Sequence, residues 1–318
     1  MTRPRLAPLI DDYLTVRRRL GFKLDKPEAL LTDFADYVDR IGHDGPITVE
    51  LALAWVVSSS SGRASRAARL AAVRGFARHQ AAFEPATEIP PAGLLGRGPR
   101  RKQPHIYSDE EIAALLNQAS LLSPRDGLCP RTYVTLFGLL ASTGLRPSEA
   151  CRLEVGDVDL IRGVLTVRET KFRKSRLVPM HPTTTQALTH YAAFRDAAAV
   201  ASRSARFFRT ERTLALTADA VYSTFARLRQ HLGWTSHGRA RRPRVCDLRH
   251  TFAVRRLLGW YADGVDVNSR ILALSTYLGH AGVADTYWYL SAVPELMAIA
   301  SQRFERLAAP DRGQEDVA

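Results

Sequence analysis

The sequence predicts a mainly α-helical protein of two domains with one small antiparallel β-hairpin or sheet. Apolar residues recur at helical spacing along most of the chain, and only one pair of β-prone runs interrupts them. A segment rich in proline and glycine, 86–104, separates two helical regions. With 318 residues, the chain is long enough for about two domains.

Residues 1–85 are predicted to form a small helical DNA-binding domain. Apolar side chains repeat every three or four positions between Leu9 and Ile41, residues 42–46 should end that helical part, and Thr48 should begin another helix.

A basic helix is predicted over residues 58–79, where arginines including Arg63, Arg66 and Arg74 alternate with alanines. Such a face is either simply solvated or contacts phosphates. Few acidic residues balance it, which favours phosphate contact.

The segment 86–104 is interpreted as a basic linker, because Arg101 and Lys102 lie near its end. The polar tail 309–318 is expected to be disordered. Between them, residues 105–308 should form the second domain, which opens with a helix capped by Ser108.

In this domain the β-prone runs Val164–Val167 and Leu177–Pro179 predict a hairpin whose tip carries Lys171, Arg173 and Lys174. A turn in solvent often contains lysine, but this chain has only five lysines, so two at one tip are notable. An ammonium group can protonate a leaving alkoxide, whereas a guanidinium with a pKa above ~12 does so poorly.

The charge balance favours a polyanionic partner. The formal charge is +13 and the pI is about 10.1, as expected for a protein that binds DNA or RNA. No apolar run approaches the ~20 residues of a membrane span, and the first residues form no apolar leader, so we expect a cytoplasmic protein. The three cysteines are far apart and indicate neither disulfides nor a zinc site.

Several short motifs could carry chemistry. Arg146 lies at a helix start between Gly144 and Pro147, where backbone N–H groups favour an anion, and Glu149 could return a hydrogen bond to the arginine or the cap. Arg249 lies beside an apolar helical stripe, which would fix its position.

Two further motifs have ordinary structural interpretations when each is taken alone. A histidine such as His280, which follows a glycine, is more often structural than functional. The aromatic cluster around Tyr289 would usually be core packing.

Together the motifs resemble the tyrosine recombinase, or phage integrase, family. The ordered elements are TGLRPSE, a K-x-x-K-x-R hairpin, DLRHTFA, LGH, and a tyrosine nine residues after that histidine. The resemblance covers about 105–305, and the preceding helical region is similar to the family's core-binding domain. The segment 260–290 is similar to recombinases of bacterial mobile elements. This resemblance implies a two-domain clamp around double-stranded DNA.

The resemblance also implies a role for each matching residue. Arg146 and Arg249 would bind the scissile phosphate, Lys171 would protonate the departing 5′-oxygen, and His280 would hydrogen-bond the phosphate. Tyr289 would be the nucleophile that forms a 3′-phosphotyrosine, with no metal or nucleotide cofactor. The proteins would act as a homo-tetramer on paired sites.

The sequence departs from the family pattern at Cys246, where members usually have histidine. A thiol is a weaker hydrogen-bond partner than imidazole, which puts the efficiency of cleavage in doubt. His250, about 100° around a helix from Arg249, is interpreted as structural. Tyr287 is the rival nucleophile, although it should face another side of its helix.

Two other functions compete with recombination. A type IB topoisomerase shares the same chemistry, and Cys246 keeps open a DNA-binding accessory subunit that has lost catalysis. The compact size and the separate helical domain favour recombination. Partner recombinases in place of identical subunits are an alternative to the homo-tetramer.

Overall fold

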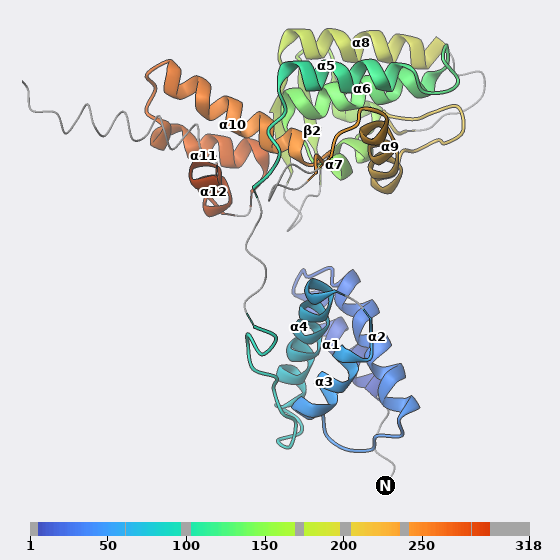
Figure 1. The fold of residues 1–318 in the computed structure, drawn as a ribbon, viewed down its shortest axis with the longest axis vertical. Helices are drawn as coiled ribbons and strands as arrows, with labels where there is room; N and C mark the ends of the chain where they lie inside the picture. The colour runs from blue at the N-terminus through green and yellow to red at the C-terminus, as the bar shows by residue number, and fades with distance from the viewer. Residues whose placement is uncertain are drawn as a thin grey trace, which may run out of the picture. The chain divides into compact units, whose positions relative to one another are not determined.

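The computed structural model describes residues 6–60, 62–96, 103–168, 175–197, 205–235, 242–280 and 282–292. The chain divides into two compact units, Met1–Arg101 and Lys102–Ala318 (Figure 1). None of the described helices is long and apolar enough to cross a membrane. The predicted fold class, mainly helical with a small antiparallel sheet, is confirmed.

The described residues of the first unit form four helices that pack around one apolar core. They are α1 (Leu6–Arg19), α2 (Asp25–Arg40), α3 (Val49–Val57) and α4 (Arg63–Gln80). The expected start at Thr48 is confirmed, since its hydroxyl accepts a hydrogen bond from the N–H of Leu51. In the core, Trp55 is fully buried against Phe34, and the guanidinium of Arg69 lies 3.8 Å from the indole ring centre.

The basic helix begins later than predicted, at Arg63 rather than at residue 58. Ser58 belongs to the end of α3: its N–H donates to Ala54 and its hydroxyl donates to the carbonyl of Trp55. A serine that satisfies the preceding helix end in this way cannot also begin the next helix.

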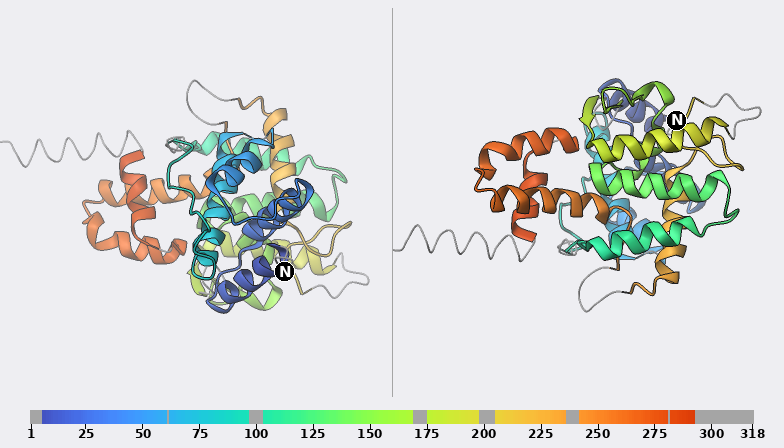
Figure 2. Two further views of the ribbon diagram at one scale, coloured as in Figure 1. Left: turned by 90° about the horizontal axis from the view of Figure 1, so that it is seen from below. Right: turned by 90° about the horizontal axis from the view of Figure 1, so that it is seen from above.

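The second unit contains eight α-helices among its described residues. They are α5 (Asp109–Ser120), α6 (Leu128–Thr143), α7 (Pro147–Arg152), α8 (Pro182–Ala197), α9 (Ala218–His231), α10 (Asp247–Ala262), α11 (Val267–Leu278) and α12 (Ala284–Ala292). The cap predicted at Ser108 is confirmed as a full capping box with Glu111. In Figures 1 and 2, α5, α6 and α8 lie side by side, and α10, α11 and α12 group together at one end of that layer.

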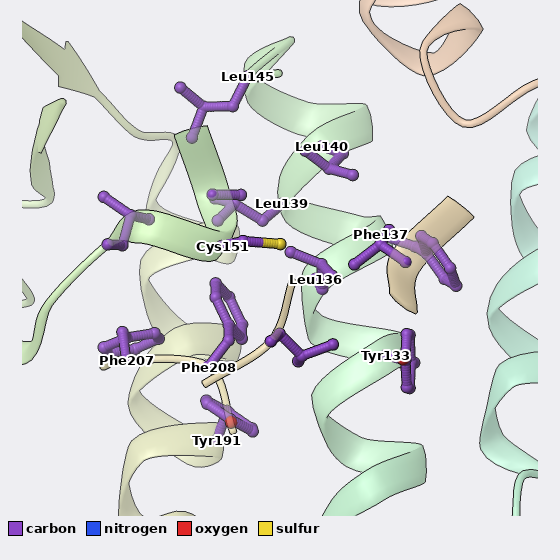
Figure 3. Close-up of a cluster of buried hydrophobic side chains, with 14 of the residues drawn as sticks. Tyr133, Leu136, Phe137, Leu139, Leu140, Leu145, Cys151, Tyr191, Phe207 and Phe208 are labelled. Carbon is purple, nitrogen blue, oxygen red and sulfur yellow. The ribbon is translucent and has the colours of Figure 1, made fainter. Parts of the chain in front are cut away.

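The main core of this unit lies against α6. Figure 3 shows Leu136, Phe137 and Leu140 of this helix in one cluster with Phe208, which comes from the segment after α8. A smaller cluster joins α10, α11 and α12 and includes Tyr289. These two cores fix the ends of α6, α10 and α11 relative to one another, and the candidate site lies at those ends.

A three-stranded antiparallel sheet lies beside the helices. Its strands are β1 (Val158–Asp159), β2 (Val164–Val167) and β3 (Arg176–Pro179), in the order β1-β2-β3. The register pairs Leu165 with Val178, both fully buried, and so confirms the predicted hairpin. Its tip, with Lys171, Arg173 and Lys174, lies outside the described residues, as do the tail 309–318 and the linker residues Arg101 and Lys102.

Candidate active site

Arg146 lies where α6 ends and α7 begins. Gly144 closes α6 in the left-handed region with φ of 64°, and a Cβ there would lie 2.7 Å from the ring of Phe252. Arg146 is then the N-cap of α7, and Pro147 takes the first helical position, as predicted. The chain at Gly144, two residues before the arginine, therefore passes close to α10, which carries Phe252.

Glu149 is the anion at the centre of the site, and its side chain is only 2% exposed. It accepts hydrogen bonds from the backbone N–H of Arg146 at 3.0 Å and from the guanidinium of the same residue at 2.7 Å. Arg176, at the start of β3, donates to both carboxylate oxygens, at 3.2 and 2.8 Å. Burial alone would raise the pKa of Glu149, but the hydrogen bonds and charge of Arg176, with those of Arg146, outweigh it and lower the pKa to about 2.

Arg249 is the most enclosed cation of the site, at 6% exposure. It donates to the carbonyl of Gly144 at 2.8 Å and to that of Leu278 at 2.7 Å, so it joins the C-terminal ends of α6 and α11. Burial, followed by the charge of Arg146, lowers its pKa to about 10. The guanidinium remains protonated at neutral pH and is fixed in place by the two helix ends.

Three consecutive carbonyls at the end of α11 each accept a hydrogen bond from a different arginine. Tyr277 accepts from Arg176 at 2.8 Å, Leu278 from Arg249, and Gly279 from Arg146 at 3.3 Å. Gly279 has φ of 68°, and a Cβ there would lie 2.6 Å from the guanidinium of Arg176. One helix end thus positions three cations, and it requires glycine to do so.

His280 follows this helix end directly. Its Nδ1 lies 2.7 Å from the hydroxyl oxygen of Thr286 on α12, a residue that is fully buried. Burial and then the charges of Arg249 and Arg146 lower the pKa of His280 to about 4. The imidazole is therefore neutral near pH 7 and can offer a hydrogen bond without adding charge.

Tyr289 on α12 points into the second unit and is 2% exposed, whereas Tyr287 is 45% exposed. The Tyr289 hydroxyl lies 3.0 Å from Nδ1 of His250 on α10. Its ring is stacked at 6.2 Å from the ring of His280 and lies 5.4 Å from that of His250. The fold therefore brings Tyr289 together with both histidines, whereas Tyr287 remains exposed to solvent.

Cys246, the N-cap of α10, contacts a different group. Its sulfur lies 3.5 Å from the hydroxyl of Tyr222 on α9. Burial and then this hydrogen bond raise the pKa of Tyr222. The residue at the family's histidine position is thus engaged with α9 in this structure.

The arginines predicted as DNA contacts in α4 hold nearby backbone. Arg63 donates to Leu95, Arg66 to Ser59, and Arg74 to Pro90 and Pro91. These bonds fix the chain before and after α4, and contact with DNA stays a prediction for these residues.

Sequence reasoning missed two members of the site. Arg176 is the last residue of the K-x-x-K-x-R pattern, which offered a signal, but its partners Glu149 and Tyr277 are distant in the sequence. His250 was interpreted as structural, and its contact with Tyr289 joins two helices that only the fold brings together. Among the described residues, no group of three His, Cys, Asp or Glu side chains could hold a metal ion.

The charge of Glu149 should be required for stability. Its pKa is lowered on folding, so its contribution is fully present above about pH 4.5 and is lost as the pH falls towards 2. We expect Glu149→Gln to lower the free energy of unfolding at pH 7 by about 3 kcal/mol, because two cations then lose their buried partner.

Urea denaturation at pH 7 and pH 3 measures this effect, and the difference between wild type and variant should shrink at pH 3. Glu154→Gln is the control, since its ion pair with Arg206 is half-exposed and is worth at most ~1 kcal/mol. Equal stability losses in the two variants would contradict the central role of Glu149.

The sequence of this chain is similar to those of a known protein family. Residues 108–295 match the phage integrase family. A protein of Sinorhizobium fredii named as an integrase/recombinase, y4rB, is 44% identical over 303 residues, which cover 93% of this chain and 96% of that protein.

Two solved structures share the fold. The Tn1549 transposon integrase in complex with transposon right end DNA has a TM-score of 0.66 at 17% identity, over 95% of this chain and 99% of that one. A lambda integrase tetramer bound to a Holliday junction has a TM-score of 0.62 at 17% identity, over 89% and 76%. Because the family match covers more than half of the chain and the relative is similar over nearly all of it, this chain belongs to the phage integrase family, the tyrosine recombinases that break and rejoin DNA.

Proposed function

We propose that this site-specific recombinase cleaves DNA at a phosphate bound between Arg146 and Arg249, with Tyr289 as the nucleophile. The observation that carries the proposal is a fixed excess of positive charge. The guanidiniums of Arg146 and Arg176 pair with the carboxylate of Glu149, and Arg146 and Arg249 donate to neighbouring carbonyls at the end of α11. These three cations and one carboxylate give the cluster a formal charge of +2. His280 adds no charge near pH 7, because its pKa is lowered.

This charge suits the transition state of phosphodiester cleavage. A phosphodiester carries one negative charge, and a second develops on the non-bridging oxygens as the nucleophile adds. Arg249 uses two of its five N–H groups in bonds to carbonyls of the described residues. Donors that are already fixed need no reorganisation during the reaction, so they stabilise the added charge most effectively.

The proposed reaction proceeds through a covalent intermediate. The Tyr289 oxygen attacks phosphorus, the bond between phosphorus and the 5′-oxygen breaks, and the strand remains attached through a 3′-phosphotyrosine. Lys171 supplies the proton to the departing 5′-oxygen. A 5′-hydroxyl from another strand then attacks the phosphotyrosine and releases Tyr289, which completes strand exchange without an added cofactor.

The substrate of this reaction is double-stranded DNA, held by basic residues on both units. The candidate contacts are Arg63, Arg66, Arg74, Arg101, Lys102, Arg173 and Lys174. Similarity to an integrase tetramer on a Holliday junction supports assembly as a homo-tetramer on paired sites. Family membership favours site-specific recombination over a topoisomerase or an accessory subunit.

Loss of the phenolic oxygen should abolish the covalent adduct. We expect wild-type protein on a nicked suicide substrate that carries its recombination site to give an adduct that survives SDS, and Tyr289→Phe to give none. Tyr287→Phe is the matched control and should retain the adduct, because that side chain is exposed on another side of α12. Adduct formation by Tyr289→Phe, or its loss in Tyr287→Phe alone, would refute the assignment.

A histidine at position 246 should improve cleavage. Imidazole is a stronger hydrogen-bond donor than a thiol, and one such bond to a charged phosphate corresponds to about a tenfold change in rate. We expect Cys246→His to form adduct about tenfold faster than wild type in single-turnover assays. Cys246→Ser controls for loss of the sulfur contact with Tyr222, and a Cys246→His rate no higher than that of the serine variant would contradict the prediction.

A further inference from the structure

When the Tyr289 oxygen attacks phosphorus, its phenolic proton must pass to another group. A phenol attacks phosphorus well only if its proton leaves as the new bond forms. Within the described residues, the hydroxyl of Tyr289 has a ring nitrogen of His250 at 3.0 Å, which is a normal hydrogen-bond distance.

The other polar groups of the site are less suited to accept this proton. Arg146 and Arg249 are cations that hold no free electron pair. His280 has its Nδ1 engaged with Thr286, and Cys246 is directed to Tyr222 on α9. Position 246, where the family usually has histidine, therefore does not bring a base to the hydroxyl in this structure.

His250 lies one helical turn after Cys246 on α10, and residues four apart share a helix face. Its imidazole is held from the side by Trp288, whose ring centre lies 5.7 Å away in an edge-to-face arrangement. This packing aims Nδ1 at the Tyr289 oxygen, since Trp288 and Tyr289 are neighbours on α12. With the ring proton on Nε2, Nδ1 is an acceptor.

We propose that His250 is the proton acceptor for the Tyr289 nucleophile, an imidazole placed one turn along α10 from the position that the family usually uses. As the bond between the Tyr289 oxygen and phosphorus forms, the phenolic proton moves to Nδ1 of His250, which becomes an imidazolium. The bond between phosphorus and the 5′-oxygen breaks, and that oxygen takes its proton from another group. In religation the imidazolium returns the proton to the phenolate as it leaves.

This inference rests on the proposed role of Tyr289, and its test separates the two. Single-turnover adduct formation is measured for wild type, His250→Ala and His250→Asn on an ordinary suicide substrate. The same proteins are measured on a substrate whose 5′-bridging oxygen is replaced by sulfur. The asparagine oxygen can accept the hydrogen bond of Tyr289 in place of Nδ1 but cannot take up the proton. The sulfur leaving group needs no protonation, so that substrate rescues only defects on the leaving-group side.

We expect both His250 variants to form adduct about 100-fold more slowly than wild type on both substrates, whereas Lys171→Ala recovers on the sulfur substrate. His190→Ala, at an exposed position on α8, is the control and should equal wild type. Thermal melting and DNA binding by gel shift establish that the variants are folded and bind the site.

Three results would overturn the proposal. A wild-type or faster rate for His250→Ala would mean that the hydrogen bond between His250 and Tyr289 contributes nothing to cleavage or slows it. A wild-type rate for His250→Asn would reduce His250 to a positioning residue. Recovery of His250→Ala on the sulfur substrate would place its action on the leaving group. If wild type itself forms no adduct on its site, the role of Tyr289 fails instead.

Discussion

The end of α11 is the constraint on which the site depends. Its last carbonyls, at Tyr277, Leu278 and Gly279, accept hydrogen bonds from three arginines that come from β3, α10 and the turn before α7. Helix C-termini carry partial negative charge and unpaired carbonyls, so they satisfy cations that would otherwise repel one another. The arginines are therefore fixed before any phosphate arrives, and the buried carboxylate of Glu149 fixes two of them from the other side.

The same arrangement links electrostatics to chemistry. Glu149 neutralises part of the positive charge, which allows three guanidiniums to share a small volume. The remaining positive charge is the one that the proposed binding of a phosphate requires. Burial, and then the charges of Arg249 and Arg146, lower the pKa of His280 and keep the imidazole neutral. On α12, Thr286 and Tyr289 contact His280 and His250, so the helix that carries the proposed nucleophile is joined to the cation cluster through two histidines.

Much of this could be predicted from local sequence. The cap at Ser108, the hairpin of β2 and β3 and the helix start at Arg146 depend on neighbouring residues, and each was found where expected. Strand β1 was not predicted, because a strand of two residues shows too little periodicity to be recognised in the sequence. The start of α4 was misplaced because Ser58 belongs to the end of α3, and the alternation of arginine and alanine did not define where the next helix begins.

Contacts between residues far apart in the chain could not be predicted from local sequence patterns. Arg176 contacts Glu149 and Tyr277, which are distant from it in the sequence. His250 contacts Tyr289, which lies 39 residues later on α12. An isolated helical wheel separated His250 from Arg249 correctly but could not reveal that α12 covers the face where His250 lies.

Identifying the residue that becomes joined to DNA would test the role of Tyr289 directly. The adduct trapped on a suicide substrate would be digested with protease and nuclease, and the nucleotide-bearing peptide sequenced by tandem mass spectrometry. We expect a single modified residue, Tyr289, linked to a 3′-phosphate. A nucleotide on Tyr287, Tyr277 or any other side chain, or a 5′-linkage, would contradict it.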